Sequence, residues 1–225
     1  MIMEVWDLFA KLSYAIIGLF VVISAIFFKH LPKPFKLLAF LFFTDAFFET
    51  CSVLLRNYSE DGTNLFISPL ANLATLFIIS VFYLRFVLRR GQYRIVYIVL
   101  SSLAVFLVVR DVIYALEGDF QNLHFLSLFY SSFMIAVFTI TYFLQIAMYS
   151  DMKIVRNYLI LSVVFFLHAL FGMLFAVGIN FMINESLEIV SYFWISRISL
   201  MLITNVVLII MIWKLGRTRR RLQSD

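Results

Sequence analysis

The chain has few of the residues that most enzyme sites require. It contains one cysteine, three histidines, three prolines and seven glycines, and only 14% of its 225 residues are charged. The lone Cys51 cannot form a disulfide within the chain, and His30, His124 and His168 do not have the spacing of a zinc site. No Gly-x-Ser-x-Gly elbow or glycine-rich phosphate loop is present. We therefore expect no metal and no cofactor, although a carboxylate pair could still carry acid–base chemistry, which leaves an enzyme role uncertain.

Apolar residues dominate the chain instead. They make up 64% of it, with 27 phenylalanines and a mean hydropathy of +1.00, which a soluble domain could not bury. An apolar helix of about 20 residues crosses a bilayer, and such runs predict an all-α membrane protein. We expect one transmembrane domain over residues 1–225, a bundle of seven helices at 6–28, 35–55, 68–88, 95–116, 123–148, 158–180 and 190–213. Ser68 and Pro69 predict the N-cap and the first turn of the third helix, and residues 214–225 form a basic tail.

Basic residues gather on one side of the predicted membrane. Fourteen of the 18 lysines and arginines lie at the connections after the first, third and fifth helices or after the seventh, and acids lie at the opposite connections. Because such basic loops stay on the cytoplasmic side, we expect the N-terminus outside and the C-terminus in the cytoplasm. This asymmetry explains the net charge of +5, so no nucleic acid partner is expected. Four tail residues are expected to contact anionic lipid or a cytoplasmic partner: Arg217, Arg219, Arg220 and Arg221.

Ionisable side chains within the spans are the candidate functional residues, because placing one in a membrane costs about 2.5–3.5 kcal/mol. The second helix carries Asp45, Glu49, Ser52 and Arg56 at spacings of four, three and four, which places them on one face. We do not expect this face to meet lipid. Asp45 and Glu49 are candidates for groups that bind or couple to a proton.

Three more ionisable residues occur within other spans: Arg110, His168 and Arg197. With a rise of about 1.5 Å per residue, they and Glu49 fall in the middle and outer half of the bilayer. We expect these four to line one ligand or switch pocket, with Glu49 and Arg197 as its switchable ion pair. The alternative is that buried charges only fix helix packing. His168 also fits a packing role, and Arg110 and Asp111 are expected to lie close enough to the interface to be solvated.

Three functions remain open at this point. The leading hypothesis is a sensory or signalling module that binds a small ligand, or responds to membrane state, and acts through a separate partner protein. The second is a small, proton-coupled transporter, in which Asp45 and Glu49 would carry the proton. The third is a structural membrane subunit. A retinal protein is not expected, because the last span has no lysine before Lys214.

Three stretches carry a resemblance to a known group of proteins. They are "KHLPKPFKLLAFLFF" at the start of the second helix, "ANLATLFIISVFYLRFVLRR" in the third and "YFWISRISLMLITNVVLIIMIWK" in the last. With these stretches the whole chain resembles small, largely uncharacterised seven-helix membrane proteins of Bacteroidota. The resemblance implies a bacterial inner-membrane location, genomic proximity to two-component signalling genes in some members, and an acid at the position of Glu49. The third helix departs from the pattern, because "TLFIISVFY" has no acid at its midpoint.

Overall fold

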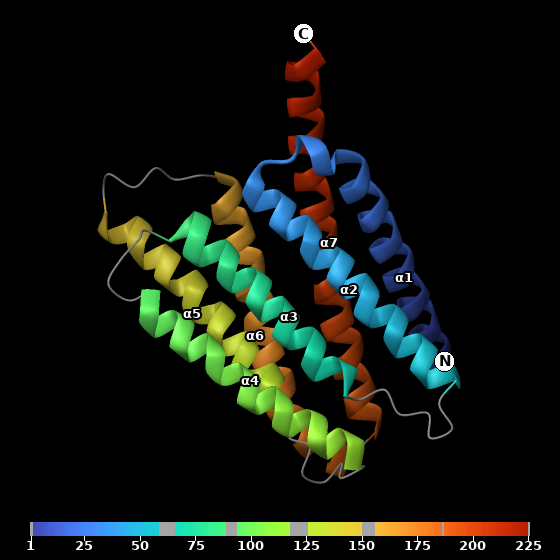
Figure 1. The fold of residues 1–225 in the computed structure, drawn as a ribbon. Helices are drawn as coiled ribbons and strands as arrows, with labels where there is room; N and C mark the ends of the chain where they lie inside the picture. Colours follow the sequence, from blue (N-terminus) through green and yellow to red (C-terminus); the bar gives the residue numbers. More distant parts are fainter. Residues whose placement is uncertain are drawn as a thin grey trace.

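A computed structural model describes residues 2–58, 66–88, 94–117, 126–149, 156–185 and 187–224. The described part is almost entirely helical (Figure 1). Its long helices are α1 (Ile2–Phe27), α2 (Lys33–Tyr58), α3 (Ile67–Phe82), α4 (Arg94–Glu117), α5 (Leu126–Met148), α6 (Arg156–Glu185) and α7 (Leu187–Ser224). A 3-10 turn, η1 (Phe28–His30), follows α1, and a π-helical segment, η2 (Tyr83–Val87), extends α3. Within these described residues, seven helical segments are long and apolar enough to cross a membrane, which confirms the predicted number of helices of this kind.

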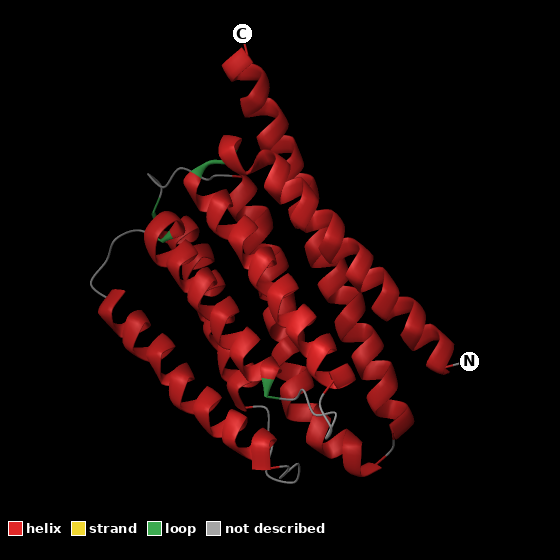
Figure 2. Cartoon of the chain, turned by 45° about the vertical axis from the view of Figure 1, so that its right-hand side comes forward, coloured by secondary structure: helices red, strands yellow, loops and turns green. Residues whose placement is uncertain are grey.

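Six of the helices form a closed ring, and α4 lies outside it. α1 packs against α2 and α7, and the ring continues from α2 through α3, α5 and α6 to α7. α4 packs against α3 and α5 at the perimeter, as Figure 2 also shows. α1 and α7 run in the same direction (Figure 1). The first helix therefore contacts both the second and the last.

One end of the bundle carries most of the basic residues, and we call it the basic end. It comprises the end of α1, the starts of α2, α4 and α6, the end of α3 with η2, and the emerging part of α7. The basic residues described there are Lys29, Lys33, Lys36, Arg85, Arg94, Arg156, Lys214 and Arg217. The far end of the bundle, where α1 begins and α2 ends, is called the opposite end below.

The large apolar core lies in the half of the bundle toward the basic end. On α2 its buried residues run from Phe35 to Phe42, and on α3 and η2 they run from Leu76 to Val87. A much smaller apolar cluster of Leu128, Phe175 and Ala176 lies toward the opposite end. Several buried polar residues lie in that half as well: Asp111, Ser127, Ser131 and Ser132. The large apolar side chains of the core are therefore concentrated toward the basic end, and the buried carboxylate of Asp111 lies toward the other.

Helix α7 is longer than predicted, since it runs unbroken from Leu187 to Ser224. The predicted tail is thus the last part of this helix, and only Asp225 of that tail lies outside the residues whose backbone the structure describes. The stretch contains no proline, and its leucine, lysine, arginine and glutamine residues all favour helix. Basic side chains also stabilise the C-terminal end of a helix dipole. In Figure 1 this part of α7 stands beyond the other helices.

Two local features of α3 differ from the prediction. The helix begins at Ile67, after Phe66, and no side chain caps it, so the predicted N-cap at Ser68 was wrong. Pro69 does lie in the first turn, where its missing N–H removes no helical hydrogen bond. At the other end the Leu88 amide donates to the Tyr83 carbonyl at 2.8 Å, the five-residue spacing of a π-helix.

Candidate functional site

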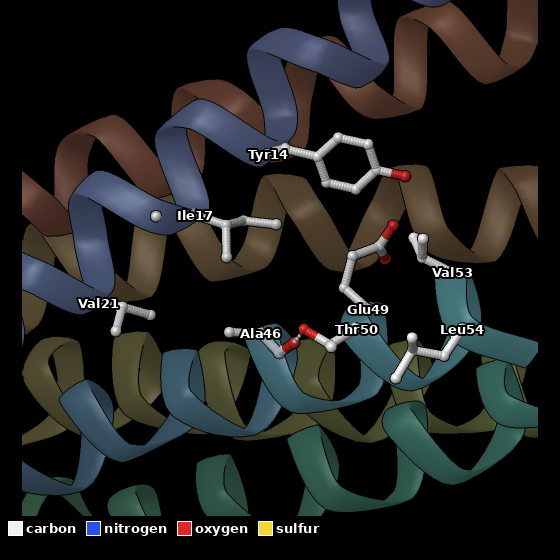
Figure 3. A pocket seen from close by; sticks show the side chains of 9 residues that line it. Tyr14, Ile17, Val21, Ala46, Glu49, Thr50, Val53 and Leu54 are labelled. Atoms are coloured by element: carbon white, nitrogen blue, oxygen red, sulfur yellow. Dashed lines mark hydrogen bonds between the residues drawn. The ribbon is translucent and has the colours of Figure 1, made fainter.

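A groove of about 450 Å³ lies between α1 and α2, and Glu49 is the charged residue in its wall. The volume falls within the range of about 300–1,000 Å³ that is typical of small-molecule sites. In Figure 3 the Glu49 side chain reaches from α2 toward α1, and its carboxylate faces the side on which the Tyr14 phenol lies. The groove is lined by Tyr14, Ile17, Gly18 and Val21 of α1 and by Ala46, Glu49, Thr50, Val53 and Leu54 of α2.

The groove exists because small residues line α1 and α2 at this level. A Cβ atom added to Gly18 would meet no atom within 4 Å, and Ala46 stands on the α2 side. Nearer the basic end, Phe20 stacks on Phe42 and fills the contact between the same helices. The Thr50 hydroxyl donates to the Ala46 carbonyl at 2.7 Å and is thereby turned onto its own helix. Recognition of a ligand would therefore depend on the Glu49 carboxylate.

The second acid of α2, Asp45, lies one turn closer to the basic end. It is half-buried and near enough to Glu49 for the two to interact electrostatically, but it is not part of the groove wall. Among the residues that the structure describes, neither acid forms an ion pair or a hydrogen bond. Ser52 is half-buried on the same helix, and the Arg56 side chain lies outside the description. The described part of the predicted stripe thus supplies one groove residue, Glu49.

The helix that forms one wall of the groove also packs along α7. At the basic end, Gly216 of α7 lies directly against Phe27 of α1. A Cβ atom added to Gly216 would come within 2.5–2.7 Å of three side-chain atoms of Phe27, so only glycine fits without a shift. α1 therefore touches the groove with one face and α7 with another. Because packed interiors deform little, a displacement of α1 at the groove must also change its contact with α7.

His168 and Arg197 come together in a different part of the bundle, between α6 and α7. The Arg197 guanidinium lies over the Phe175 ring, 4.6 Å from its centroid, and His168 is near enough to feel its charge. Phe175 itself is buried and packs in the small cluster with Leu128. The His168 Nδ1 atom is buried and has no hydrogen-bond partner in the described part of the chain. Gly172 lies one turn further along α6, against Ser132 of α5.

Asp111 joins α4 to α5, and Arg110 lies beside it on α4. Asp111 is 0% exposed, which overturns the expectation that it is solvated. Its Oδ2 atom accepts a hydrogen bond of 2.8 Å from the Ser127 amide, one of the free N–H groups of the first turn of α5. Arg110 is one-third exposed, lies over the Tyr114 ring and approaches Asp111 to 3.7 Å. The carboxylate thus caps a neighbouring helix, which explains its burial.

The four residues predicted to share one pocket are therefore divided. The structure brings His168 and Arg197 together, whereas Glu49 faces α1 and Arg110 lies over its own helix. No ion pair joins Glu49 to Arg197 in the described coordinates of these two side chains. Of the tail residues, Arg217 lies over the Trp213 ring at 5.4 Å. The side chains of the other three lie outside the description: Arg219, Arg220 and Arg221.

Sequence reasoning missed the α1 wall of the groove. The residues singled out on α2 were carboxylates within an apolar run, and neither Tyr14 nor Gly18 carries a charge of that kind. Their spacing does carry a signal, because Tyr14, Gly18 and Val21 are separated by four and three residues and so lie on one helical face. A glycine and a tyrosine on the same face of an otherwise bulky helix indicate a local gap with a polar edge.

Metal binding finds no support in the described residues, since no three His, Cys, Asp or Glu side chains gather there. The chain matches no protein-family model, no curated protein and no solved structure. Chemically, the groove offers a carboxylate in a mostly apolar wall, on a helix pair that is linked to α7.

Proposed function

We propose that this chain is a seven-helix sensory module of a bacterial inner membrane, with its N-terminus outside and its basic end in the cytoplasm. A small molecule in the α1–α2 groove would change the position of α1, and α7 would pass the change to a separate signalling partner. The observation that supports this most strongly is the double contact of α1, with the groove at Gly18 and with α7 at Phe27.

The distribution of packing supports the same proposal. A ligand shifts a bundle only by its different affinity for two arrangements of the helices. At the basic end the aromatic core, with Phe82 and Tyr83 buried together, resists rearrangement. The groove lies farther from the basic end than this core does, where α1 and α2 leave space beside Gly18. Occupied and empty grooves would therefore differ in the position of the part of α1 beside Gly18, while the aromatic packing around Phe82 and Tyr83 is kept.

The form of α7 suits it to carry the output. Gly216 of α7 lies beside the end of α1. From there to Ser224, α7 extends by about 12 Å, at about 1.5 Å per residue. This length carries Arg217 and three further arginines, so it suits an acidic protein surface or anionic lipid head groups. A continuous helix transmits a shift or rotation of its membrane part along its own axis.

Spin labels on the two coupled helices test this proposal. Ile26 of α1 and Ile210 of α7 are both exposed, so a Cys51→Ser, Ile26→Cys, Ile210→Cys variant can be labelled without disturbing the core. The protein is placed in liposomes of synthetic phosphatidylglycerol, with or without a total lipid extract of bacterial inner membrane. We expect the extract to shift the distance distribution between the labels, and Gly18→Leu, which fills the groove, to remove that response.

Two results would contradict the proposal. One is a distance distribution that the extract leaves unchanged, or that shifts equally in the Gly18→Leu protein. The other is proton or solute flux in the same liposomes, followed with an enclosed pH dye. Flux that disappears in an Asp45→Asn variant would establish the transporter instead, because the Asp45–Glu49 pair would then be carrying protons.

A further inference from the structure

The groove between α1 and α2 has a polar part with apolar lining on both sides of it. Glu49, Tyr14 and Thr50 form the polar part, Ile17 and Val21 continue the wall toward the middle of the bundle, and Val53 and Leu54 lie on the other side of Glu49. From Tyr14 to Val21 the helix rises by about 10 Å. A ligand that follows this wall must have a polar head and an apolar body.

The charge of the polar part selects the head group. Glu49 is the one carboxylate among the lining residues, and none of them is a lysine, arginine or histidine. The other acid of the same helix, Asp45, lies one turn away and brings no positive charge to the groove. A carboxylate in an apolar wall is stabilised most by a cationic nitrogen, through a charge-assisted hydrogen bond or direct charge pairing. The Tyr14 ring beside it offers an aromatic face, which also attracts cations.

The groove opens toward the bilayer. Only α1 and α2 form its walls, and its rim includes exposed Leu54 and Thr50. The α1 surface next to it exposes Leu19 and Val22, which in a membrane-spanning helix meet lipid. A ligand resident in the bilayer can therefore enter sideways, with its head at the level of Glu49 and its tail pointing toward the bilayer centre. This is the orientation that a lipid has in the leaflet at that end.

We propose that the α1–α2 groove binds a membrane-resident amphiphile with a cationic nitrogen head group, which Glu49 holds while Ile17 and Val21 contact the tail. The role of this ligand as a signal rests on the proposed sensory function, but its binding does not and can be measured separately. It names the chemical class of ligand to which the sensor responds.

Photolabelling of the full-length protein in maltoside micelles, which carry no charge, tests the ligand class. The probes are a long-chain alkylamine with a diazirine in its chain, and the alcohol and carboxylate of the same length. We expect the amine to label the peptides that contain Tyr14–Val21 and Ala46–Leu54 about tenfold more than the alcohol does. Glu49→Gln should remove this preference, whereas Glu117→Gln, which removes an exposed acid from the same end of the bundle, should keep it.

Several outcomes would overturn the inference. They are equal labelling by the three probes, stronger labelling by the carboxylate, or an unchanged amine preference in Glu49→Gln. If Glu49→Gln does not fold, Gly18→Leu must still reduce labelling of both peptides, and excess unlabelled alkylamine must compete for the wild-type site. A Glu49-dependent amine preference without any change in the α1–α7 label distance would keep the binding site and reject the sensory function. A change in label distance that depends on Gly18, without any preference for the amine, would keep the sensory function and reject the proposed ligand class.

Discussion

The contact between Gly216 and Phe27 gives the sharpest prediction about stability. Gly216→Ala places a Cβ atom 2.5–2.7 Å from three atoms of Phe27, among them its Cβ, which no side-chain rotation can move away. The helices must separate, and overpacking of this kind costs about 1–3 kcal/mol. Because the clash involves the Phe27 Cβ, we take the upper part of this range, about 2–3 kcal/mol. Better helix propensity returns about 1 kcal/mol, so we expect a net loss of about 1–2 kcal/mol. At about 2–4 °C per kcal/mol for a chain of this length, the unfolding temperature should fall by about 2–8 °C.

Gly18→Ala is the matched control, since the same methyl group enters open space there. It should be neutral or should raise the free energy of unfolding by up to about 1 kcal/mol. Both variants are compared by thermal and denaturant unfolding in one detergent, alone and with Phe27→Gly, which removes all three contact atoms. Gly216→Ala should lose its cost in the Phe27→Gly background. A Gly216→Ala protein as stable as the wild type, or a cost that Phe27→Gly does not relieve, would refute the close packing of α1 on α7.

Three further predictions concern the buried charges. Asp111→Ala should lower the free energy of unfolding by about 0.5–2 kcal/mol and speed hydrogen exchange at the Ser127 amide, whereas Asp111→Asn, which keeps an acceptor, should lose less; an unchanged exchange rate would argue against the cap. A double-mutant cycle of Arg197→Gln with Phe175→Leu should give a coupling of about 0.5–2 kcal/mol, and a coupling near zero would remove the cation–π contact. The losses from Glu49→Gln and Arg197→Gln should add to within about 0.5 kcal/mol, because the structure separates these residues, and strong coupling would restore the predicted ion pair.

The membrane-spanning helices were predictable from the sequence because each is a local property of the chain. A bilayer demands a long apolar run with internally satisfied backbone groups, and such runs are visible without any knowledge of neighbours. The length of α7 beyond Trp213 could not be predicted in this way. The apolar run ends at the membrane edge, but the helix continues through polar residues such as Arg217. Hydropathy therefore locates membrane spans better than it locates helix ends.

The site was predictable only in part, for a related reason. Glu49 stood out because a carboxylate in an apolar run is costly wherever its helix packs. Its partner helix depends on the ring order, which places α1 beside α2 and α7, and no single-sequence pattern encodes that order. Asp111 was misjudged because its distance from the helix end suggested solvent, whereas the first turn of α5 covers it. Gly18 contributes to the groove because it has no side chain to fill the space, and a search for polar residues does not detect this.

The most direct test of the proposed ligand site is an experimental structure of the protein extracted from its native membrane without removal of lipids. We predict density for an elongated molecule between α1 and α2, with its head at the Glu49 carboxylate and the Tyr14 ring and its tail along Val21. The same preparation of Gly18→Leu should lack that density. An empty groove in the wild-type protein, or α1 packed closely on α2 beside Gly18, would contradict ligand binding there.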